Sequence, residues 1–360
     1  MRSFMKTIRL LFILLCLSQV ANAQVRLLDE DTRTPIAYAT VMNKGQLVCY
    51  SDTAGYVKLP ADSDAAISIQ HIAYQTYEGS AKDLPKEVLL TPIHYNLSDI
   101  EVKAMHPDYI RLKGYFRSYE VNSEKKDSTL KYFVDGIVEY YIPIKKGKVK
   151  HRIIEYRSFE DGSFQDEKAI PLMADLDIGK PEIPKIVTGT PRVESDILSS
   201  KKYQQTKDGG IMIKGVLAGV MKTDSLHHRL MSINWVAPRD KISISLFGLY
   251  SVQVTKDIYT VYSKLINDSF SWSGLMSQSD SQKWEFKTRK KHDILVETYS
   301  EFYVQEHDLV TKDALKDLGL ASGNKVPDSH NYTSTYWNAS YIPHNNAYVE
   351  KMLAHVMKMK

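Results

Sequence analysis

Cysteine is nearly absent from this chain, and the two that occur cannot stabilise it together. Among 360 residues, only Cys16 and Cys49 are cysteines. Cys16 lies in a segment that we expect to be removed, so one thiol remains and no intrachain disulfide can form. A hydrophobic core must therefore hold the fold, and the chain is long enough for two domains of ordinary size.

An excess of charge is also lacking. Lys and Arg number 47 against 43 acidic residues, and removal of the N-terminal segment takes away Arg2, Lys6 and Arg9. The formal net charge then falls from +4 to +1, so we expect no nucleic-acid partner. After residue 23, no apolar run approaches the roughly 18 residues of a membrane-spanning helix, so we expect no transmembrane segment in the mature chain.

Motifs of known catalytic chemistry are missing as well. No histidine has Glu or Asp three positions later, as zinc carboxypeptidases require, and the HExxH motif is absent. The sequence contains no GxSxG nucleophile elbow, no P-loop and no GxGxxG turn. Lys44 is the only basic residue within five positions of Cys49, which predicts an inert thiol. We therefore expect no enzyme activity, no metal and no cofactor.

The N-terminal residues 1–23 have the parts of a secretory signal peptide. Basic residues precede the apolar run LLFILLCL at residues 10–17, which is too short for a stable membrane-spanning helix. Ala21-Asn22-Ala23 has the small-x-small pattern of a cleavage site. We predict cleavage after Ala23, and a mature protein that lies in the periplasm or is associated with the outer membrane.

Residues 24–103 predict short antiparallel strands separated by turns. Apolar and polar residues alternate over 66–72 (AISIQHI), with Ile67 and Ile69 on one face. The sequence SDTAG at residues 51–55 predicts a tight turn, because Asp52 can accept hydrogen bonds from nearby backbone N–H groups and Gly55 can adopt a positive φ. The pattern favours a β-sandwich in which the Asp52–Gly55 turn is structural.

Ordered blocks in this region carry a resemblance to a known family. They are residues 34–41 (TPIAYATV), 51–57 (SDTAGYV), 67–74 (ISIQHIAY), 88–90 (VLL) and 97–102 (LSDIEV). In this order they resemble the carboxypeptidase regulatory-like domain of Bacteroidetes envelope proteins, with Ser51 in place of a Thr and Ala73 in place of a Gly. The resemblance covers less than a quarter of the chain. It implies a seven-stranded, transthyretin-like sandwich that builds the fold and catalyses nothing.

The rest of the chain predicts a hinge at 104–112, around Pro107, and a larger antiparallel β domain at 113–360. Residues 166–200 contain four prolines and predict an irregular insertion. We expect helices at 311–318 and 347–359, the second with an apolar stripe. We expect strands at 112–121, 130–144, 149–159, 211–220, 241–254, 259–265, 282–288 and 294–304. The chain is thus predicted to be mainly β, with one or two short helices.

The larger domain also resembles, more loosely, chains that follow this sandwich in Bacteroidetes proteins. Residues 132–141 (YFVDGIVEYY) and Tyr336-Trp337-Asn338 carry that resemblance. It implies a curved antiparallel sheet, similar to the half-barrels of lipoprotein carriers. Separately, the sequences around Thr53, Ser128 and Ser225 (DTA, DST and DSL) resemble the O-glycosylation signal of Bacteroidetes periplasmic proteins.

Together these observations predict an exported, non-catalytic protein of the cell envelope with a binding or scaffold role. In this hypothesis the sandwich is a folding and docking module, and the larger domain binds an envelope protein or an apolar ligand. One alternative is a periplasmic carrier or chaperone for lipid or lipoprotein, which requires an apolar cavity. Another is a hydrolase whose carboxylates come from distant strands and meet in a cleft.

Overall fold

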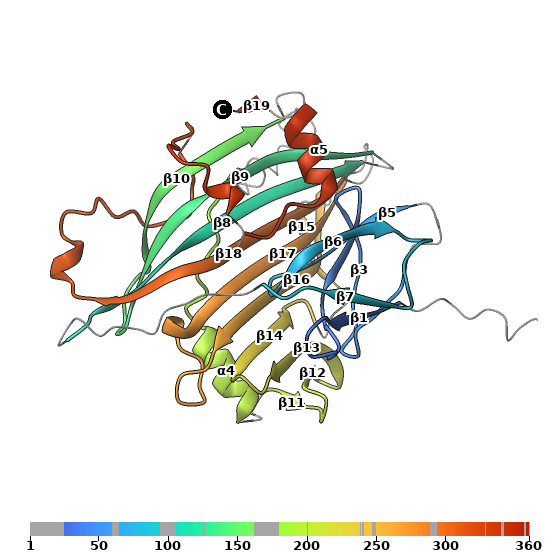
Figure 1. Ribbon diagram of the computed structural model, residues 1–360, viewed down its shortest axis with the longest axis horizontal. Coiled ribbons are helices and arrows are strands. Elements are labelled where there is room, and N and C mark those ends of the chain that lie inside the picture. The colour runs from blue at the N-terminus through green and yellow to red at the C-terminus, as the bar shows by residue number, and fades with distance from the viewer. Residues whose placement is uncertain are drawn as a thin grey trace, which may run out of the picture.

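The computed structural model describes residues 25–59, 65–93, 106–124, 127–161, 180–199, 201–237, 239, 241–246, 250–288, 294–327, 329–339, 342–355 and 358–359. The predicted signal peptide and the predicted block at 97–102 lie outside these residues. Within them the protein is mainly β, as the sequence predicts, and forms three sheets (Figure 1). No helix in this part of the chain is both long enough and apolar enough to cross a membrane.

Two small sheets form the predicted N-terminal sandwich of seven strands. One sheet has the order β4-β1-β7, and the other has the order β3-β2-β5-β6. The strands are β1 (Val25–Asp29), β2 (Thr40–Asn43), β3 (Gln46–Tyr50), β4 (Tyr56–Val57), β5 (Ala66–His71), β6 (Tyr74–Ser80) and β7 (Glu87–Leu90). Leu27, Val41 and Ile69 are fully buried between the sheets, because alternate residues of each strand point inward.

Twelve strands of the described chain form one large sheet, ordered β11-β12-β13-β14-β16-β17-β18-β8-β9-β10-β19, with β15 paired to β16. They are β8 (Tyr109–Glu124), β9 (Asp127–Pro143), β10 (Lys150–Glu160), β11 (Gln204–Gln205), β12 (Gly210–Ile213), β13 (Val216–Thr223), β14 (His228–Asn234), β15 (Ile242–Leu246), β16 (Tyr250–Lys264), β17 (Leu275–Thr288), β18 (Ile294–Val310) and β19 (Lys358–Met359). Each strand pairs antiparallel with its neighbours. β18 pairs with β8, so strands far apart in the sequence lie side by side (Figure 1).

Several predicted strand boundaries are wrong. The predicted strand at 211–220 is a hairpin of β12 and β13, whose two turn residues, Lys214 and Gly215, both have positive φ. The predicted strand at 241–254 is divided between β15 and β16, which pair with each other. β8 already begins at Tyr109, inside the predicted hinge.

The helices also differ from the prediction. The region predicted to be irregular contains α4 (Thr190–Leu198), because Pro191 stands in the first turn, where a helix tolerates proline. The helix predicted at 311–318 is only a 3-10 turn, η2 (Asp313–Leu315), whose one buried residue provides no apolar face. The C-terminal helix, α5 (Ala347–His355), is shorter than predicted, and β19 follows it.

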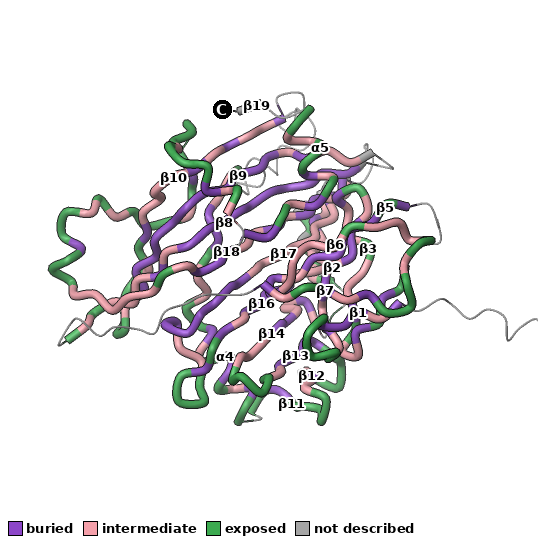
Figure 2. The backbone as a smooth tube through the Cα atoms, viewed as in Figure 1, coloured by how far each residue is buried: buried purple, intermediate pink, exposed green. Residues whose placement is uncertain are grey.

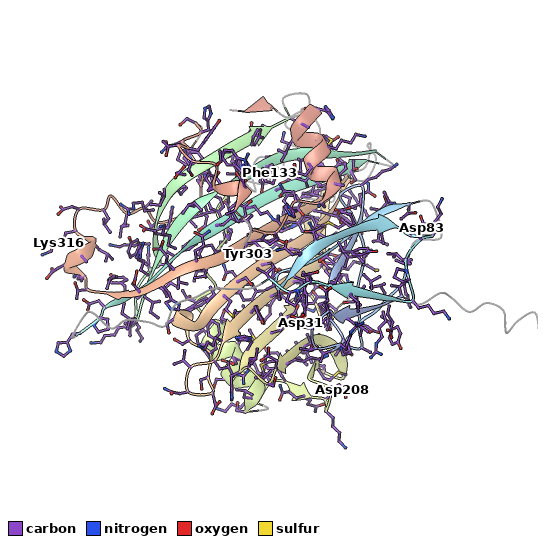
Figure 3. All side chains as sticks on the ribbon, in the orientation of Figure 1. Asp31, Asp83, Phe133, Asp208, Tyr303 and Lys316 are labelled. Atoms are coloured by element: carbon purple, nitrogen blue, oxygen red, sulfur yellow. The ribbon has the colours of Figure 1, made fainter. Side chains whose placement is uncertain are left out.

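The central strands of the large sheet are mostly buried (Figure 2), and apolar clusters lie on both of its faces. We call one the α4 face, because Phe116, Val134 and Phe302 there share an apolar cluster with Ile197 of α4. We call the other the sandwich face, where Tyr119 and Phe133 share a cluster with Met42 of the sandwich. Figure 3 shows Tyr303, also on the sandwich face, near the middle of β18, and Phe133 beside α5.

The sandwich is fixed to the sheet by contacts from its four-stranded half. On β2, Val41 points into the sandwich while its neighbour Met42 packs against the sheet and against Val349 of α5. The backbone N–H of Leu47 donates to Glu297 Oε2 at 3.0 Å, and Ser277 Oγ donates to the Ile72 carbonyl at 3.2 Å. The sandwich therefore covers one face of the sheet and leaves the α4 face to other elements.

One tight contact between the sandwich and α5 leads to a test of this docking. Gly45 has a φ of +74°, and a Cβ there would lie 2.5 Å from Cδ1 of Tyr348. We expect Gly45→Ala to lower the free energy of unfolding by about 1–3 kcal/mol. Gly215→Ala is the matched control, because Gly215 has a φ of +79° but a Cβ added there would meet no atom within 4 Å.

Thermal unfolding of the two variants is compared. Both variants place alanine at a positive φ, so the difference between them measures the cost of the contact with Tyr348. A Tyr348→Ala background should remove the extra loss at Gly45, because the ring that the methyl group meets is then gone. Equal losses of stability in Gly45→Ala and Gly215→Ala would mean that the turn between β2 and β3 does not pack tightly against α5.

Candidate functional site

Polar side chains form a small grid on the α4 face of the large sheet. One row crosses three strands as Ser118, Ser300 and Asp280, which are direct cross-strand neighbours. The next row is Glu120, Thr298 and Gln282. Direct neighbours have Cβ atoms about 5 Å apart, so the six side chains form one continuous surface.

The grid borders the apolar cluster of the α4 face. The adjoining row at one end contains Phe116 and Phe302, which belong to the α4-face cluster. Ser118 is 2% exposed and Glu120 is 0% exposed. Ser118 Oγ has no hydrogen-bond partner among the described residues. Because burying polar groups without partners costs free energy, such a grid on a core face calls for a reason other than stability.

An open cleft of about 410 Å³ lies over the grid. Its walls include Tyr132 of β9, Trp284 of β17 and the segment 180–185. That segment is held in place, because Tyr140 donates to the Pro184 carbonyl at 2.6 Å and Gln278 Nε2 donates to the Lys185 carbonyl at 2.9 Å. The volume is within the range of pockets that hold small ligands.

The electrostatics of the cleft floor favour neutral or compensated carboxyl groups. Burial, and to a smaller extent the charge of Asp257, raise the pKa of Asp280 to about 7, and the charge of Lys185 opposes this rise. Burial also raises the pKa of Asp257, whose carboxylate accepts a hydrogen bond from Gln282 Nε2 at 3.3 Å. Burial holds the pKa of Tyr132 well above its usual value, and the charges of Glu120 and Glu182 add to this effect.

The cleft has the groups needed to bind a polar molecule. Carboxyl, hydroxyl and amide groups accept and donate hydrogen bonds, and Trp284 and Tyr132 provide aromatic surface. Trp284 Nε1 donates to Gln282 Oε1 at 3.2 Å, which orients the indole ring at the end of the grid. Among the described residues, no cluster of three or more His, Cys, Asp or Glu side chains is arranged to hold a metal ion.

Two other cavities border the sandwich face. One encloses about 40 Å³ between the sandwich and the sheet, beside His71, which is enough for water and too small for a larger ligand. Burial lowers the pKa of His71 to about 4, so its ring is neutral at physiological pH. The other is an open groove of about 520 Å³ beside β3, and Cys49 is part of its wall. Burial raises the pKa of the Cys49 thiol, which agrees with an inert side chain.

None of the candidate site residues named from the sequence (Asp52, Gly55, Thr53, Ser128 and Ser225) lines the cleft. Asp52 Oδ1 accepts from the N–H groups of Ala54 and Tyr56 at 2.9 Å, and Gly55 has a φ of +83°. A Cβ at Gly55 would lie 2.6 Å from the Leu27 carbonyl oxygen, so the turn packs against β1.

The three O-glycosylation candidates lie in separate elements. The Thr53 carbonyl, in the Asp52 turn, accepts a hydrogen bond from Lys222 Nζ at 2.9 Å. Ser128 is half-buried on β9, where its Oγ donates to the Lys44 carbonyl at 2.9 Å. Ser225 is exposed in the turn between β13 and β14.

The cleft residues had no distinct signal in the sequence. Along β8, the polar residues Ser118, Glu120 and Asn122 alternate with Tyr119 and Val121, and this pattern normally indicates that the polar side faces solvent. Gln278, Asp280 and Gln282 alternate with serines on β17, so neither face of that strand was distinguished. The register between strands brings these positions together, and periodicity within one strand cannot predict register.

Comparison with known proteins adds little. No family model and no curated protein matches this sequence. Lipovitellin, in a structure titled for its lipid–protein interactions, is 6% identical with a TM-score of 0.24, over 68% of this chain and 28% of that chain. DynF, from the dynemicin biosynthesis pathway of Micromonospora chersina, is 9% identical with a TM-score of 0.19, over 61% of this chain and 96% of that chain. At such TM-scores the likeness carries no argument about function, and the family resemblance stays a prediction.

Proposed function

We propose that this protein is an exported, non-catalytic binding protein of the cell envelope, and that its cleft binds a small, hydroxyl-rich ligand such as a saccharide. The observation that carries the proposal is the grid of six polar side chains on a core face of the sheet, with Ser118 Oγ buried and unpartnered. The sandwich packs on the opposite face of the large sheet, which is where we expect a docking module that leaves the cleft open. Export and envelope location rest on the predicted signal peptide and on the family resemblance alone.

A saccharide fits the groups that line the cleft. Its hydroxyl groups both donate and accept hydrogen bonds, which suits a floor of Ser, Thr, Gln, Asp and Glu side chains. Its ring also has a face of C–H groups that can pack on an aromatic ring such as Trp284. An apolar ligand would leave the buried Ser118 hydroxyl of the floor without a partner, so the grid favours a polar ligand over the apolar one expected from the sequence.

An array of immobilised, defined oligosaccharides tests this proposal. We expect the mature protein to bind a subset of the array, and we expect Trp284→Ala and Ser118→Val to weaken that binding by about tenfold or more. Ser245→Val, at an exposed position of β15, is the matched control and should bind as the wild type does. Circular dichroism confirms that each variant is folded. Binding that is absent, or unchanged in both cleft variants, contradicts the proposal.

Hydrolysis of the bound saccharide is a second candidate, and one observation favours it. The cleft contains two carboxyl groups from different strands, Glu120 and Asp280, and the pKa of Asp280 near 7 suits a general acid. Glycosidases use two carboxyl groups that flank the bond to be cleaved. In the grid these two lie at opposite corners, on β8 and β17 with β18 between them. Chromatography of the oligosaccharides that bind, after long incubation with the protein, distinguishes the two candidates. If the wild type cleaves the oligosaccharides and Asp280→Asn does not, the protein is a hydrolase and the proposal of a non-catalytic binding protein is wrong.

A further inference from the structure

The open groove beside β3, which we call the β3 groove, exposes the edge of a sheet. Six successive residues, 47–52, line one of its walls. β3 is at the end of its four-stranded sheet and, within the described part of the chain, pairs only with β2. The outer backbone N–H and C=O groups of such an edge strand can pair with another strand. The N–H of Leu47 already donates to Glu297, so the edge that can accept a new strand begins at Val48.

Apolar side chains lie on both walls of the β3 groove. Val48 is 37% exposed on the β3 side, and Leu217 of β13 is 43% exposed on the opposite side. Of the features that commonly protect an edge strand, β3 has a bulge at Val48 but no charged residue and no proline. The groove therefore offers both backbone groups and apolar surface to an incoming chain.

The wall opposite β3 carries an excess of positive charge. Lys256 of β16 and Lys283 of β17 are direct cross-strand neighbours, and both line the groove. Like charges in this position repel each other unless an anion lies near both. Glu297 serves only one of them, because its Oε1 lies 2.9 Å from Lys283 Nζ and its Oε2 accepts from the Leu47 N–H. Half-buried Lys256 has no acidic partner among the described residues, and Asp52, on the β3 side, accepts hydrogen bonds within its own turn.

We propose that the β3 groove binds an extended segment of a partner protein, which adds as a strand to the edge of β3 and places an acidic side chain beside Lys256. Main-chain hydrogen bonds to β3 would provide affinity, and contacts with Lys256, Val48 and Leu217 would select the segment. A lipid tail has no groups that pair with a strand edge and brings no negative charge to the lysines. The β3 groove shares no lining residue with the cleft, so this inference does not depend on the proposed saccharide binding.

Selection of a phage-displayed library of random peptides, each of about ten residues, on the mature protein tests the inference. We expect the enriched peptides to share an acidic residue flanked by apolar ones. Fluorescence anisotropy of a labelled enriched peptide should show binding about tenfold weaker for Lys256→Gln, and at least about threefold weaker for Leu217→Ser. Lys316→Gln, on the exposed turn η2, is the matched control and should bind as the wild type does. Circular dichroism confirms that each variant is folded.

Pairing with the edge of β3 is tested on the peptide itself. The N–H groups of a strand point alternately to its two sides, so only every second one can donate to β3. Two analogues of the enriched peptide carry N-methyl groups on alternate residues, one analogue for each set. We expect one analogue to lose binding and the other to keep it. Loss in both analogues or in neither overturns the addition of a strand at β3.

Three further results would overturn the inference. The first is a selection that enriches no peptide, or peptides without an acidic residue. The second is equal binding of the enriched peptide to the wild type and to Lys256→Gln, because the groove would then not be the binding site. The third is self-association of the protein in sedimentation velocity that Val48→Lys abolishes, because a second copy of this chain would then occupy the groove. None of these results bears on saccharide binding in the cleft.

Discussion

Replacing Arg117 with alanine is expected to lower the free energy of unfolding by about 3–5 kcal/mol. The Arg117 side chain is 2% exposed and forms an ion pair with Glu301, whose side chain is 13% exposed. The same guanidinium donates to the Pro343 carbonyl at 2.8 Å and to Asn345 Oδ1 at 3.2 Å. The substitution leaves a mostly buried carboxylate without its cation and frees the segment that leads into α5, so both the sheet and its C-terminal cover lose stability.

Urea denaturation measures this effect against a control on the same strand. Lys113 also forms an ion pair, with Nζ 2.7 Å from Glu306 Oε1, but the two side chains are 29% and 48% exposed. Lys113→Ala should therefore cost about 1 kcal/mol or less. Joint replacement with Arg117→Met and Glu301→Gln should recover much of the loss, because neither position of the pair then holds a buried charge. Similar losses of stability for Arg117→Ala and Lys113→Ala would show that breaking the buried Arg117 pair costs no more than breaking an exposed one.

Asp280→Asn is expected to stabilise the protein at alkaline pH, by up to about 4 kcal/mol. This is the free-energy equivalent of the difference between the pKa of about 7 in the folded protein and the ordinary value of 3.8. Between these two values the folded state holds a proton that the unfolded state has released. Stability contributed by Asp280 is therefore present at acid pH and is lost as the pH rises through about 7. Asparagine cannot ionise, so the variant avoids this loss.

Unfolding of the wild type and the variant at a series of pH values isolates the effect of Asp280, because contributions of other groups cancel in the difference. The two proteins should have nearly equal stability near pH 4, and the variant should be the more stable above about pH 7. Asp313→Asn removes a carboxylate that is 83% exposed and should show no such divergence. A difference that does not change with pH would mean that Asp280 ionises as freely in the folded protein as in water.

A stabilising substitution at this position has a functional meaning. Proteins retain destabilising groups mainly where a site needs them, and removing such a group commonly raises stability while it lowers function. Asp280→Asn should therefore be both the more stable protein above neutral pH and the weaker binder of the saccharide ligand. A purely structural role for Asp280 predicts the opposite, namely a loss of stability.

Local features of the fold were predictable from the sequence because they depend on short-range chemistry. The alternation that places Ile67 and Ile69 on one face predicted a strand of the sandwich, and the structure buries both residues. The turn at Asp52 likewise needs only a side-chain acceptor and a glycine with positive φ. The single strand expected at 211–220 is wrong because a two-residue turn at Lys214-Gly215 divides it.

The cleft could not be predicted from the sequence, and the reason is different. Ser118, Ser300 and Asp280 lie on three strands whose order in the sheet is not their order in the chain, because β8 pairs with β18. Taken alone, β8 resembles a strand with one solvent-facing side, and on β17 neither face is distinguished from the other. A change of register by one residue in any one of these strands would have turned its side chain to the other face of the sheet.

The amino-acid sequence by itself determined the strand content, the sandwich and the reliance on a core without disulfides, since these follow from periodicity, turn chemistry and cysteine number. The tertiary structure alone decided which faces are covered and which polar side chains share the cleft. That division has a physical basis: hydrogen bonding and side-chain alternation act over a few residues, whereas pairing of β8, β18 and β17 joins positions that are far apart along the chain.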